Sequence, residues 1–266
     1  MATPKQWAIQ RIFDMTVKNV AGTKVHGTIK DLKEVNLENG QENVFSMGGA
    51  GNPYINSFSH SKRVTGNATA ASYSNAILAL ITGTDVVTGK TVIPFVDELR
   101  IKNDEATLTQ DAEGEAGSEI LAVEILGSGG VVETLKQGTT ASATDFEFAV
   151  GTGKLSFLAD KYDDDTLIRV YYHIETTETA HTIANKADEM SKTVRLEMRS
   201  LVRDCDDNEF AALIIVYKAK LTGNWNLTTA ADGDPSTLDV SFEGMKRDCA
   251  NSDFWKMVVY DLSTAE

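Results

Sequence analysis

Most of this chain alternates between apolar and polar residues with a period of two. In TVRLEMR every second residue is apolar, and STLDVSFEG repeats the pattern. Successive side chains of a strand point to opposite faces of a sheet, so the alternation predicts strands with one buried face and one solvated face. The run AALIIVY is continuously apolar, which is typical of a strand covered on both faces. The C-terminal part is therefore predicted to be a string of antiparallel strands that includes LTGNWNL and ends with FWKMVVYDL.

The middle of the chain has the same alternation with different turns. FEFAV and KLSFLAD flank Gly151-Thr152-Gly153, which is a hairpin signal, and LIRVYYHIE is typical of a further strand. Pro94 and a polar stretch that begins near residue 176 bound this region. We therefore predict two domains. A β domain consists of residues 1–95 and 186–266, and an inserted β-rich module, for which an immunoglobulin-like fold is one candidate, covers residues 96–185.

The first third contains the alternating stretch VHGTIKDLKEVNL and then a glycine cluster. Gly48, Gly49 and Gly51 are followed by Asn52-Pro53, a composition that does not suit the interior of a strand. The cluster predicts a bend, a loop or a place where another backbone comes close. The predicted fold class is all-β: a β-sandwich or barrel with one flanking α-helix, plus the inserted β module.

The one predicted helix runs from about Ser72 to Thr82, because apolar residues follow at helical spacing and Gly83 can end it. The next residues, GTDVVTGKT, end like a phosphate-binding loop. That loop needs four residues between its first glycine and Gly-Lys-Thr, with a strand before it and a helix after it. Here five residues separate Gly83 from Gly89, and the helix comes first. The stretch therefore predicts a helix end followed by a surface turn.

The balance of acidic and basic residues limits the kinds of partner that the chain can bind. Its 266 residues include 39 acidic and 25 basic side chains, which gives a net charge of −14. Phosphates need Lys and Arg partners, so this balance argues against stable nucleic-acid binding. No run approaches the roughly 20 apolar residues of a membrane span, and MATPKQWAIQ lacks the features of a signal peptide. We expect synthesis in a cytoplasm, no membrane association, and free thiols at Cys205 and Cys249.

No stretch of the sequence has the residue types and spacing that a known catalytic or metal-binding motif requires. The stretch DCDDNE begins like a calcium loop, but the sixth position is Glu209 rather than Gly and the twelfth is Ile215 rather than Glu. Four residues of metal-ligating type lie close in sequence, although the first falls on the polar face of its strand: His173, Glu175, Glu178 and His181. The chain has no G-x-S-x-G elbow. We predict no enzyme, no metal and no cofactor, and a hydrolase on a β scaffold is the least supported alternative.

Several stretches together carry a family resemblance. They are VFSMGGAGNPYINSFSHSKRVTGNATAASYSNAILALITGTDVVTG, then FVDELRIKNDEATLT and TDFEFAVGTGKLSFLADKYDDDTLIRVYY, then IVYKAKLTGNWNLTTAADGDPSTLDVSFEGM, and finally FWKMVVYDL. In this order they resemble the major tail tube proteins of long-tailed bacteriophages, in which a Gly-rich stretch leads into a strand and a helix ending in L-x-G, larger members carry a β insert, and a pair of strands closes the domain. The resemblance covers nearly the whole chain.

The resemblance implies a structural virion protein of the phage tail, made in the cytoplasm of the bacterial host. Six copies would form a ring around a continuous β-barrel, and stacked rings would form the tail tube through which DNA passes during ejection. The tail terminator, the tape measure and the baseplate or tail-tip proteins would be its partners besides other copies, and DNA would be present only in transit. Contractile and non-contractile tails both stay open.

Two sets of residues are predicted to serve this assembly. An acidic wall would let DNA slide without sticking, and the residues expected on the luminal face are Asp31, Glu34, Glu38 and Glu42, with an outer solvated surface as the other interpretation. For stacking between rings we expect the glycine-rich loop, since glycine permits close backbone approach, although a bend inside the subunit also explains it. Its residues are Met47, Gly48, Gly49, Gly51, Asn52, Pro53 and Tyr54.

The alternative function is a carbohydrate-binding or adhesive β-sandwich protein of a virion or cell surface. Its sugar contacts would come from Trp7, Trp225 and Trp255, because indole rings stack on sugars. Trp225 falls on the apolar side of a predicted strand and Trp255 follows Phe254, so the sequence favours core packing over an exposed sugar platform.

Overall fold

The computed structural model describes residues 5–227 and 236–261, and within them the chain is largely β-strand. The single helix of the described part is α1 (Asn75–Thr82). The predicted all-β fold class with one helix is therefore confirmed. Contacts between residues divide the chain into two compact units, which we describe separately: unit 1 is Met1–Val86 with Ile183–Glu266, and unit 2 is Val87–Thr182.

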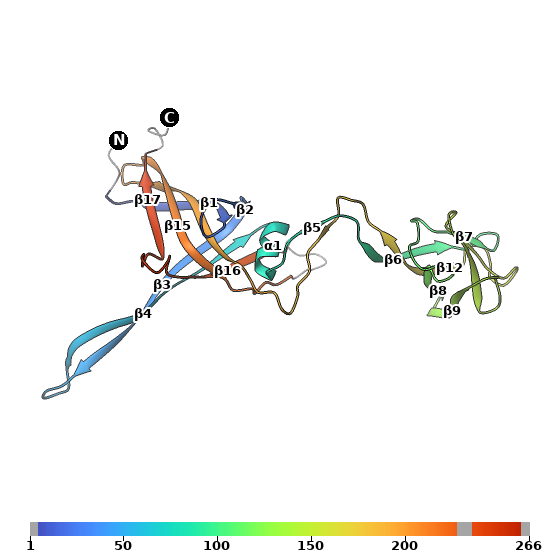
Figure 1. Cartoon of the computed structure of the whole chain (residues 1–266), viewed down its shortest axis with the longest axis horizontal. Helices are drawn as coiled ribbons and strands as arrows, with labels where there is room; N and C mark the ends of the chain where they lie inside the picture. The colour runs from blue at the N-terminus through green and yellow to red at the C-terminus, as the bar shows by residue number, and fades with distance from the viewer. Residues whose placement is uncertain (1–4, 228–235, 262–266) are drawn as a thin grey trace. The chain divides into compact units, whose positions relative to one another are not determined.

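Unit 1 is built on one eight-stranded antiparallel sheet with the strand order β2-β1-β14-β15-β16-β4-β3 (Figure 1). The eighth strand, β17, pairs with the part of β15 that β16 leaves free. The sheet curls into a half barrel, so that β1 and β3 approach each other although they are not neighbours in this order. Its strands are β1 (Ala8–Lys18), β2 (Val25–Ile29), β3 (Leu32–Met47), β4 (Tyr54–Ala70), β14 (Thr193–Arg203), β15 (Glu209–Leu221), β16 (Leu238–Gly244) and β17 (Trp255–Tyr260).

One face of this sheet carries the hydrophobic core of unit 1. On β14, Val194, Leu196 and Met198 are fully buried, and the residues between them lie on the other face. β16 follows the same alternation. Each such side chain stabilises the fold by about 1.5–3 kcal/mol when fully buried. The period of two in the sequence therefore predicts both the strands and the face that each strand buries.

Helix α1 covers part of this core face with three buried residues: Ile77, Leu80 and Ile81. It ends at Gly83, whose φ of 87° is costly for any residue with a Cβ, and a Cβ there would lie 2.2 Å from a backbone oxygen. The helix begins at Asn75 rather than at the predicted Ser72. The reason is that Tyr73 packs against the core from a non-helical segment and donates its hydroxyl hydrogen to backbone carbonyls.

The strand predicted for LTGNWNL does not form. β15 ends at Leu221, and residues 222–227 have no strand structure. Residues 231–235, whose Asp, Gly and Pro residues predict a turn between two strands, lie outside the described part of the chain. Trp225 and Leu227 therefore do not continue the sheet beyond Leu221, although their spacing in the sequence is compatible with a strand.

Unit 2 contains a seven-stranded sheet with the order β6-β12-β8-β9-β10-β11-β7, in which only β9 and β10 run parallel. A separate two-stranded ribbon pairs β5 (Val87–Thr88) with β13 (His181–Thr182). β6 begins at Val92, so residues 92–95, which the sequence assigned to the first domain, pair with β12 inside unit 2. The sheet strands are β6 (Val92–Arg100), β7 (Glu105–Thr107), β8 (Ile120–Gly127), β9 (Gly130–Gly138), β10 (Asp145–Ala149), β11 (Lys154–Ser156) and β12 (Leu167–Glu175).

Unit 2 has its own core and a buried carboxylate within it. Asp97 on β6 is buried and accepts three kinds of hydrogen bond: from the backbone N–H of Thr109 (2.8 Å), from the Thr109 hydroxyl (2.7 Å) and from the Tyr172 hydroxyl (2.8 Å). Burial, helped by the Asp97 carboxylate, raises the pKa of Tyr172 to about 12. A buried carboxylate is tolerated only when its oxygens are satisfied in this way.

We predict that Asp97→Ala lowers the free energy of unfolding of unit 2 by about 2–4 kcal/mol, because it leaves buried donors without an acceptor. Hydrogen exchange of the β6 and β12 amides, measured against denaturant, reports on this unit by itself. The matched control is Glu98→Ala on the same strand, which removes an exposed pair with Arg169 (2.8 Å) and costs less than about 1 kcal/mol. Equal losses in the two variants would contradict the role of Asp97.

Candidate assembly surface

The face of the unit 1 sheet opposite the core is polar and is divided by charge. Across β16, β4 and β3 this face carries exposed carboxylates: Glu34, Glu38, Asp239 and Glu243. Across β1 and β14 it carries a denser set of cations with fewer carboxylates: Lys18, Arg195 and Arg199, with Asp14 and Glu197. The first side also holds the exposed Arg63 of β4, opposite Gly40. One side of the polar face therefore carries mainly carboxylates, and the other carries both charges with an excess of positive charge.

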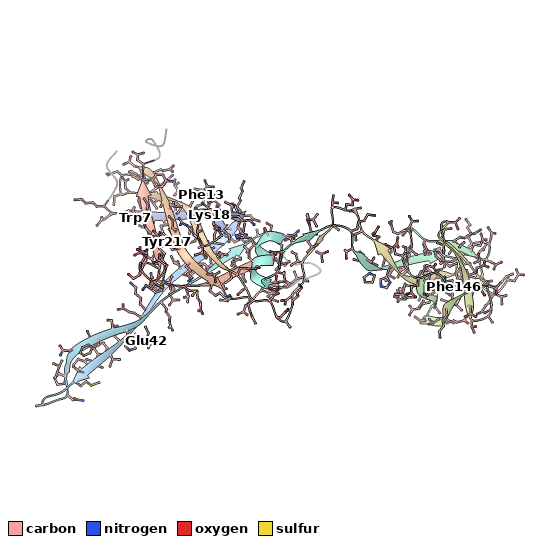
Figure 2. All side chains as sticks on the ribbon, in the orientation of Figure 1. Trp7, Phe13, Lys18, Glu42, Phe146 and Tyr217 are labelled. Atoms are coloured by element: carbon pink, nitrogen blue, oxygen red, sulfur yellow. The ribbon has the colours of Figure 1, made fainter. Side chains whose placement is uncertain are left out.

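The predicted luminal residues lie in three places. Glu34 and Glu38 are exposed on the polar face of β3, on the opposite side from the partly buried Val35 and Leu37. Asp31 lies in the connection before β3, where its backbone carbonyl accepts a hydrogen bond from an N–H group (2.9 Å). Glu42 continues the same face of β3 farther along, 3.8 Å from His60, and Figure 2 labels it on the long hairpin. Glu34 and Glu38 thus lie where β4 and β16 continue the sheet, whereas Glu42 lies beyond the reach of β16.

The cations of β1 and β14 were not predicted as a site. Lys18 and Arg195 both pair with Glu197, at 2.7 and 2.9 Å. Asp14, which is buried, accepts a hydrogen bond from Nε of Arg199 at 2.9 Å, and this bond raises the pKa of the arginine. The alternation of TVRLEMR already indicated that Arg195 and Arg199 share the polar face. The hydrogen-bond partner of Arg199, Asp14, lies 185 residues away in the chain on β1, the strand that also holds Lys18 opposite Arg195 in the strand register.

The hairpin of β3 and β4 extends well beyond the rest of the sheet (Figure 1). β16 pairs with β4 only as far as Val64, which lies opposite Gly244. Beyond this point, in the described part of the chain, residues 40–63 form strand pairs only with each other. We call residues 40–63 the arm.

The predicted stacking loop, residues 47–54, forms the tip of the arm. Its turn is closed by hydrogen bonds from the N–H of Asn52 to the carbonyl of Gly49 (3.1 Å) and from the N–H of Gly48 to the carbonyl of Pro53 (3.3 Å). Gly49 adopts a φ of 85°, which explains the need for glycine in this turn. The glycine cluster is therefore a hairpin tip with no strand beside it among the described residues.

The arm exposes more apolar surface than its tip alone. Phe45, Tyr54 and Phe58 are 45%, 68% and 62% exposed, and the rings of Phe45 and Tyr54 lie 4.7 Å apart. The other exposed large apolar residues of the arm are Val44, Met47 and Ile55. Adjacent residues such as Val44 and Phe45 point to opposite faces of a strand, so the arm is apolar on both faces. The sequence does contain a signal for this surface, because no Asp, Glu, Lys or Arg occurs between Asn43 and Ser59.

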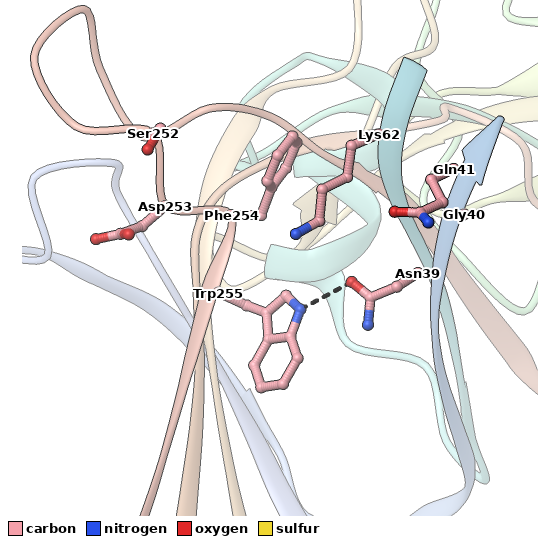
Figure 3. Close-up of a pocket in the computed structure, with 8 residues that line it drawn as sticks. All are labelled: Asn39, Gly40, Gln41, Lys62, Ser252, Asp253, Phe254 and Trp255. Atoms are coloured by element: carbon pink, nitrogen blue, oxygen red, sulfur yellow. Dashed lines mark hydrogen bonds between the residues drawn. The ribbon is translucent and has the colours of Figure 1, made fainter. Parts of the chain in front are cut away.

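A hydrogen bond between the side chains of Trp255 and Asn39, which we call the bracket, holds the base of the arm. The indole N–H of Trp255 donates a hydrogen bond to the side-chain oxygen of Asn39 at 3.0 Å, as Figure 3 shows. A cavity of about 760 Å³ opens beside this bond between the start of the arm and the segment before β17. It is lined by Asn39, Gly40, Gln41, Lys62, Ser252, Asp253, Phe254 and Trp255. Just beyond, Ser61 has a positive φ of 54° where the pairing of β3 and β4 shifts register.

The sequence predicted that Trp225 and Trp255 pack in the core, and this prediction is wrong. Trp225 is 38% exposed and lies after the end of β15, and Trp255 is 36% exposed at the start of β17. Trp7 is also 38% exposed. The sequence suggested burial because Trp225 was assigned to a strand that does not form. The indole of Trp255 instead serves the bracket at the base of the arm.

The four residues of metal-ligating type do not come together as a metal site. Glu113 donates its backbone N–H to the carbonyl of His173 (2.8 Å), and Nδ1 of His181 lies 3.0 Å from the Thr88 hydroxyl. Among residues 5–227 and 236–261, no group of three His, Cys, Asp or Glu side chains is arranged to hold a metal ion. In the same described part, no helix is long and apolar enough to span a membrane.

The half-barrel sheet of unit 1 and its arm make this an all-β protein. The chain matches the YomU/Tube protein family over residues 7–257 and therefore belongs to that family. Membership identifies it as a tube-like structural protein of a phage-derived family, a component of the virion, and favours a non-enzymatic role. A search of curated proteins finds none that matches the chain.

We predict that Trp255→Phe loosens the base of the arm without unfolding unit 1. The variant keeps an aromatic ring but loses the N–H that binds Asn39, and a lost hydrogen bond of about 0.5–1.5 kcal/mol corresponds to roughly two- to tenfold faster trypsin cleavage at Lys62 and Arg63. Mass spectrometry of timed digests measures the rate. Trp225→Phe makes the same chemical change away from the arm and is the control, and similar rates in both variants would refute the bracket.

Proposed function

We propose that this protein is the subunit of a phage tail tube, in which six copies form a ring, rings stack into a tube, and DNA passes through the bore during ejection. Membership of the YomU/Tube protein family supports a tube-like role. The half-barrel sheet of unit 1 supports ring formation, since its edge strands β2 and β3 each lack a partner on one side within the described residues. Open edges invite pairing with another chain, and closing a ring with copies of itself satisfies them.

The observation that carries this proposal is the apolar arm. Six large apolar side chains are exposed on a ribbon of two strands, and such a ribbon is marginal in water by itself. Each of these side chains stabilises a contact by about 1.5–3 kcal/mol when another surface buries it fully. Because the arm is apolar on both faces, it suits insertion between surfaces of neighbouring copies. This interpretation keeps the stacking role of residues 47–54 and extends it along the arm.

The acidic side of the polar face is the part that we propose faces the bore. Glu34, Glu38 and Glu42 follow one another on one face of β3 at intervals of about 13 Å. A wall with this spacing repels phosphates along the DNA path, and its carboxylates outnumber the exposed Arg63 that lies opposite Gly40 on the same face. Asp31, before β3, would extend the same wall. The tail terminator, the tape measure and the baseplate or tail-tip proteins would contact the ends or the bore of the tube, and no cofactor is needed.

The first test is microscopy of the purified full chain in negative stain, together with size-exclusion chromatography. We expect rings or tubes, and a solitary chain at high concentration would refute the proposal. The double variant Phe45→Asp/Phe58→Asp places a charge on each face of the arm, so we expect loss of tubes with an unchanged melting temperature. Val132→Asp changes an exposed valine of unit 2 (73% exposed) and should assemble normally.

The second test concerns the bore. We expect tubes of the triple variant Glu34→Lys/Glu38→Lys/Glu42→Lys, assembled with a short DNA duplex, to retain DNA that resists nuclease, because lysines bind phosphates and the tube wall shields them. The wild type should release it. The control carries the same charge change on exposed residues of unit 2: Asp111→Lys, Glu113→Lys and Glu115→Lys. If the control variant retains nuclease-resistant DNA and the triple variant does not, these glutamates lie outside the bore.

A further inference from the structure

A cationic pocket lies at one end of the paired strands β14 and β15. The guanidinium carbons of Arg247 and Arg195 lie 4.6 and 5.5 Å from the ring centre of Tyr217, whose place in unit 1 is labelled in Figure 2. The pocket has a volume of about 430 Å³ and also contacts the turn after β1, through Val20 and Ala21. Stacking on an aromatic ring holds a guanidinium in place while its N–H groups stay available to an anion.

The positive charge of this pocket is only partly neutralised inside the chain. Glu197 serves two cations, Lys18 and Arg195, at 2.7 and 2.9 Å. Asp248 lies 3.8 Å from Arg247, but its carboxylate is engaged by the loop itself, with the Asn251 side chain and the N–H groups of residues 250 and 251 as donors. These hydrogen bonds lower the pKa of Asp248, the Asn251 side chain most of all. Three cations thus face two carboxylates, and the Arg247 side chain makes no hydrogen bond among the described residues.

An acidic turn lies at the other end of the same two strands. Between β14 and β15, the Asp204 carboxylate accepts hydrogen bonds from the Asn208 side chain (3.0 Å) and from the N–H groups of Asp206 (2.9 Å) and Asn208 (2.8 Å). The bond from the Asn208 side chain, together with these N–H groups, lowers the pKa of Asp204. Asp204 therefore shapes the turn from within. Asp206 and Asp207 are exposed and have no ion pair among the described residues. The turn thus presents unpaired negative charge to solvent.

The strand register places these two features far apart. In the strand register, Arg195 lies opposite Lys18 of β1 near the start of β14, and Arg203 lies opposite Glu209 of β15 where the turn begins. At about 3.3 Å per residue, the pocket and the turn are roughly 30 Å apart along the strands. They cannot meet within one chain. Two copies placed one after the other along the strand direction would bring the turn of one to the pocket of the next.

The two cysteines of the chain mark the same two places. Cys205 is exposed within the acidic turn, and Cys249 is exposed two residues after Arg247. The pocket end is also the end from which the arm departs, because β16 ends at Gly244 opposite Val64 and the loop that holds Arg247 follows directly. A copy that docks at this end would therefore meet both the arm and the pocket.

We propose that the pocket formed by Arg195, Tyr217 and Arg247 binds the acidic turn of a second copy, through Asp206 and Asp207, in a head-to-tail contact. The inference rests on the proposed tube and gives its stacking a direction. The contact joins two different surfaces of the same chain, and such a contact repeats without limit instead of closing into a pair. Charge complementarity favours this occupant, since each copy with a net charge of −14 otherwise repels the next.

Charge variants test the contact in the full chain. We expect Arg247→Glu to raise the protein concentration needed for tube formation about tenfold or more, because a paired charge at an interface becomes a repulsive one. Asp206→Lys should have the same effect. The double variant Arg247→Glu/Asp206→Lys restores an attractive pair between copies and should assemble within about threefold of the wild type. The control is Lys136→Glu, which makes the same charge change on an exposed residue of unit 2.

A short bis-maleimide cross-linker tests the direction. If Cys205 of one copy lies near Cys249 of the next, the wild type gives a ladder of dimers, trimers and higher species on a denaturing gel. Cys205→Ser and Cys249→Ser should each abolish the ladder. Dimers that persist in either single variant would show a symmetric contact and overturn the proposal, as would an Arg247→Glu variant that assembles like the Lys136→Glu control.

The outcomes separate this inference from the proposed function. If the wild type forms tubes but gives no cysteine ladder, and Arg247→Glu has no effect, the proposed tube is supported and the head-to-tail contact is refuted. If the wild type gives a cysteine ladder but forms no rings or tubes, the head-to-tail contact is supported and the proposed tube is refuted. Retention of inorganic phosphate or a DNA duplex by isolated chains, lost in Arg247→Glu while assembly is unchanged, would assign the pocket to phosphate instead of to a second copy. Normal melting of each variant excludes misfolding as the cause.

Discussion

The structure depends on the burial of one face of a curled antiparallel sheet. In unit 1 that face is covered by the half barrel itself and by α1, so the core is complete over β14, β15 and β16. The hairpin of β3 and β4 is longer than the sheet that supports it. A ribbon of two strands cannot bury its own faces, since its side chains point outward from both of them. The apolar surface of the arm therefore stays uncovered unless another molecule supplies the missing layer.

Charge sets the second constraint on any association between copies. A chain with a net charge of −14 repels its own kind, and this repulsion must be offset where two copies touch. The arm meets this requirement because it has no charged residue between Asn43 and Ser59. The proposed contact between the pocket at Arg247 and the acidic turn meets it by pairing opposite charges. The two contacts differ in physical origin, so salt would weaken the second more than the first.

Unit 2 is a separate body with its own core and its own internal polar network. The buried carboxylate of Asp97 holds Thr109 and Tyr172 in place from the edge strand β6. A charge that points inward from an edge strand also discourages pairing with other chains at that edge. Association in this protein is therefore expected from unit 1, where the sheet edges and the arm stay open, rather than from the edge of unit 2 that carries β6.

Local patterns in the sequence determined the all-β class, the buried residues of β14 and β16, the Gly83 helix end and the glycine-rich turn. Each depends on side-chain alternation or on backbone conformations that only certain residues adopt. Residues 222–227 had a compatible alternation but do not form a strand, although the N–H of Thr222 still donates to the carbonyl of Ser241 on β16. Pairing across the chain decided the rest: the length of the arm beyond β16, the exposure of Phe45 and Phe58, the bracket at Trp255 and the stacking of Arg247 on Tyr217. These features join residues far apart in the sequence, and alternation within one strand carries no information about which strand will lie beside it.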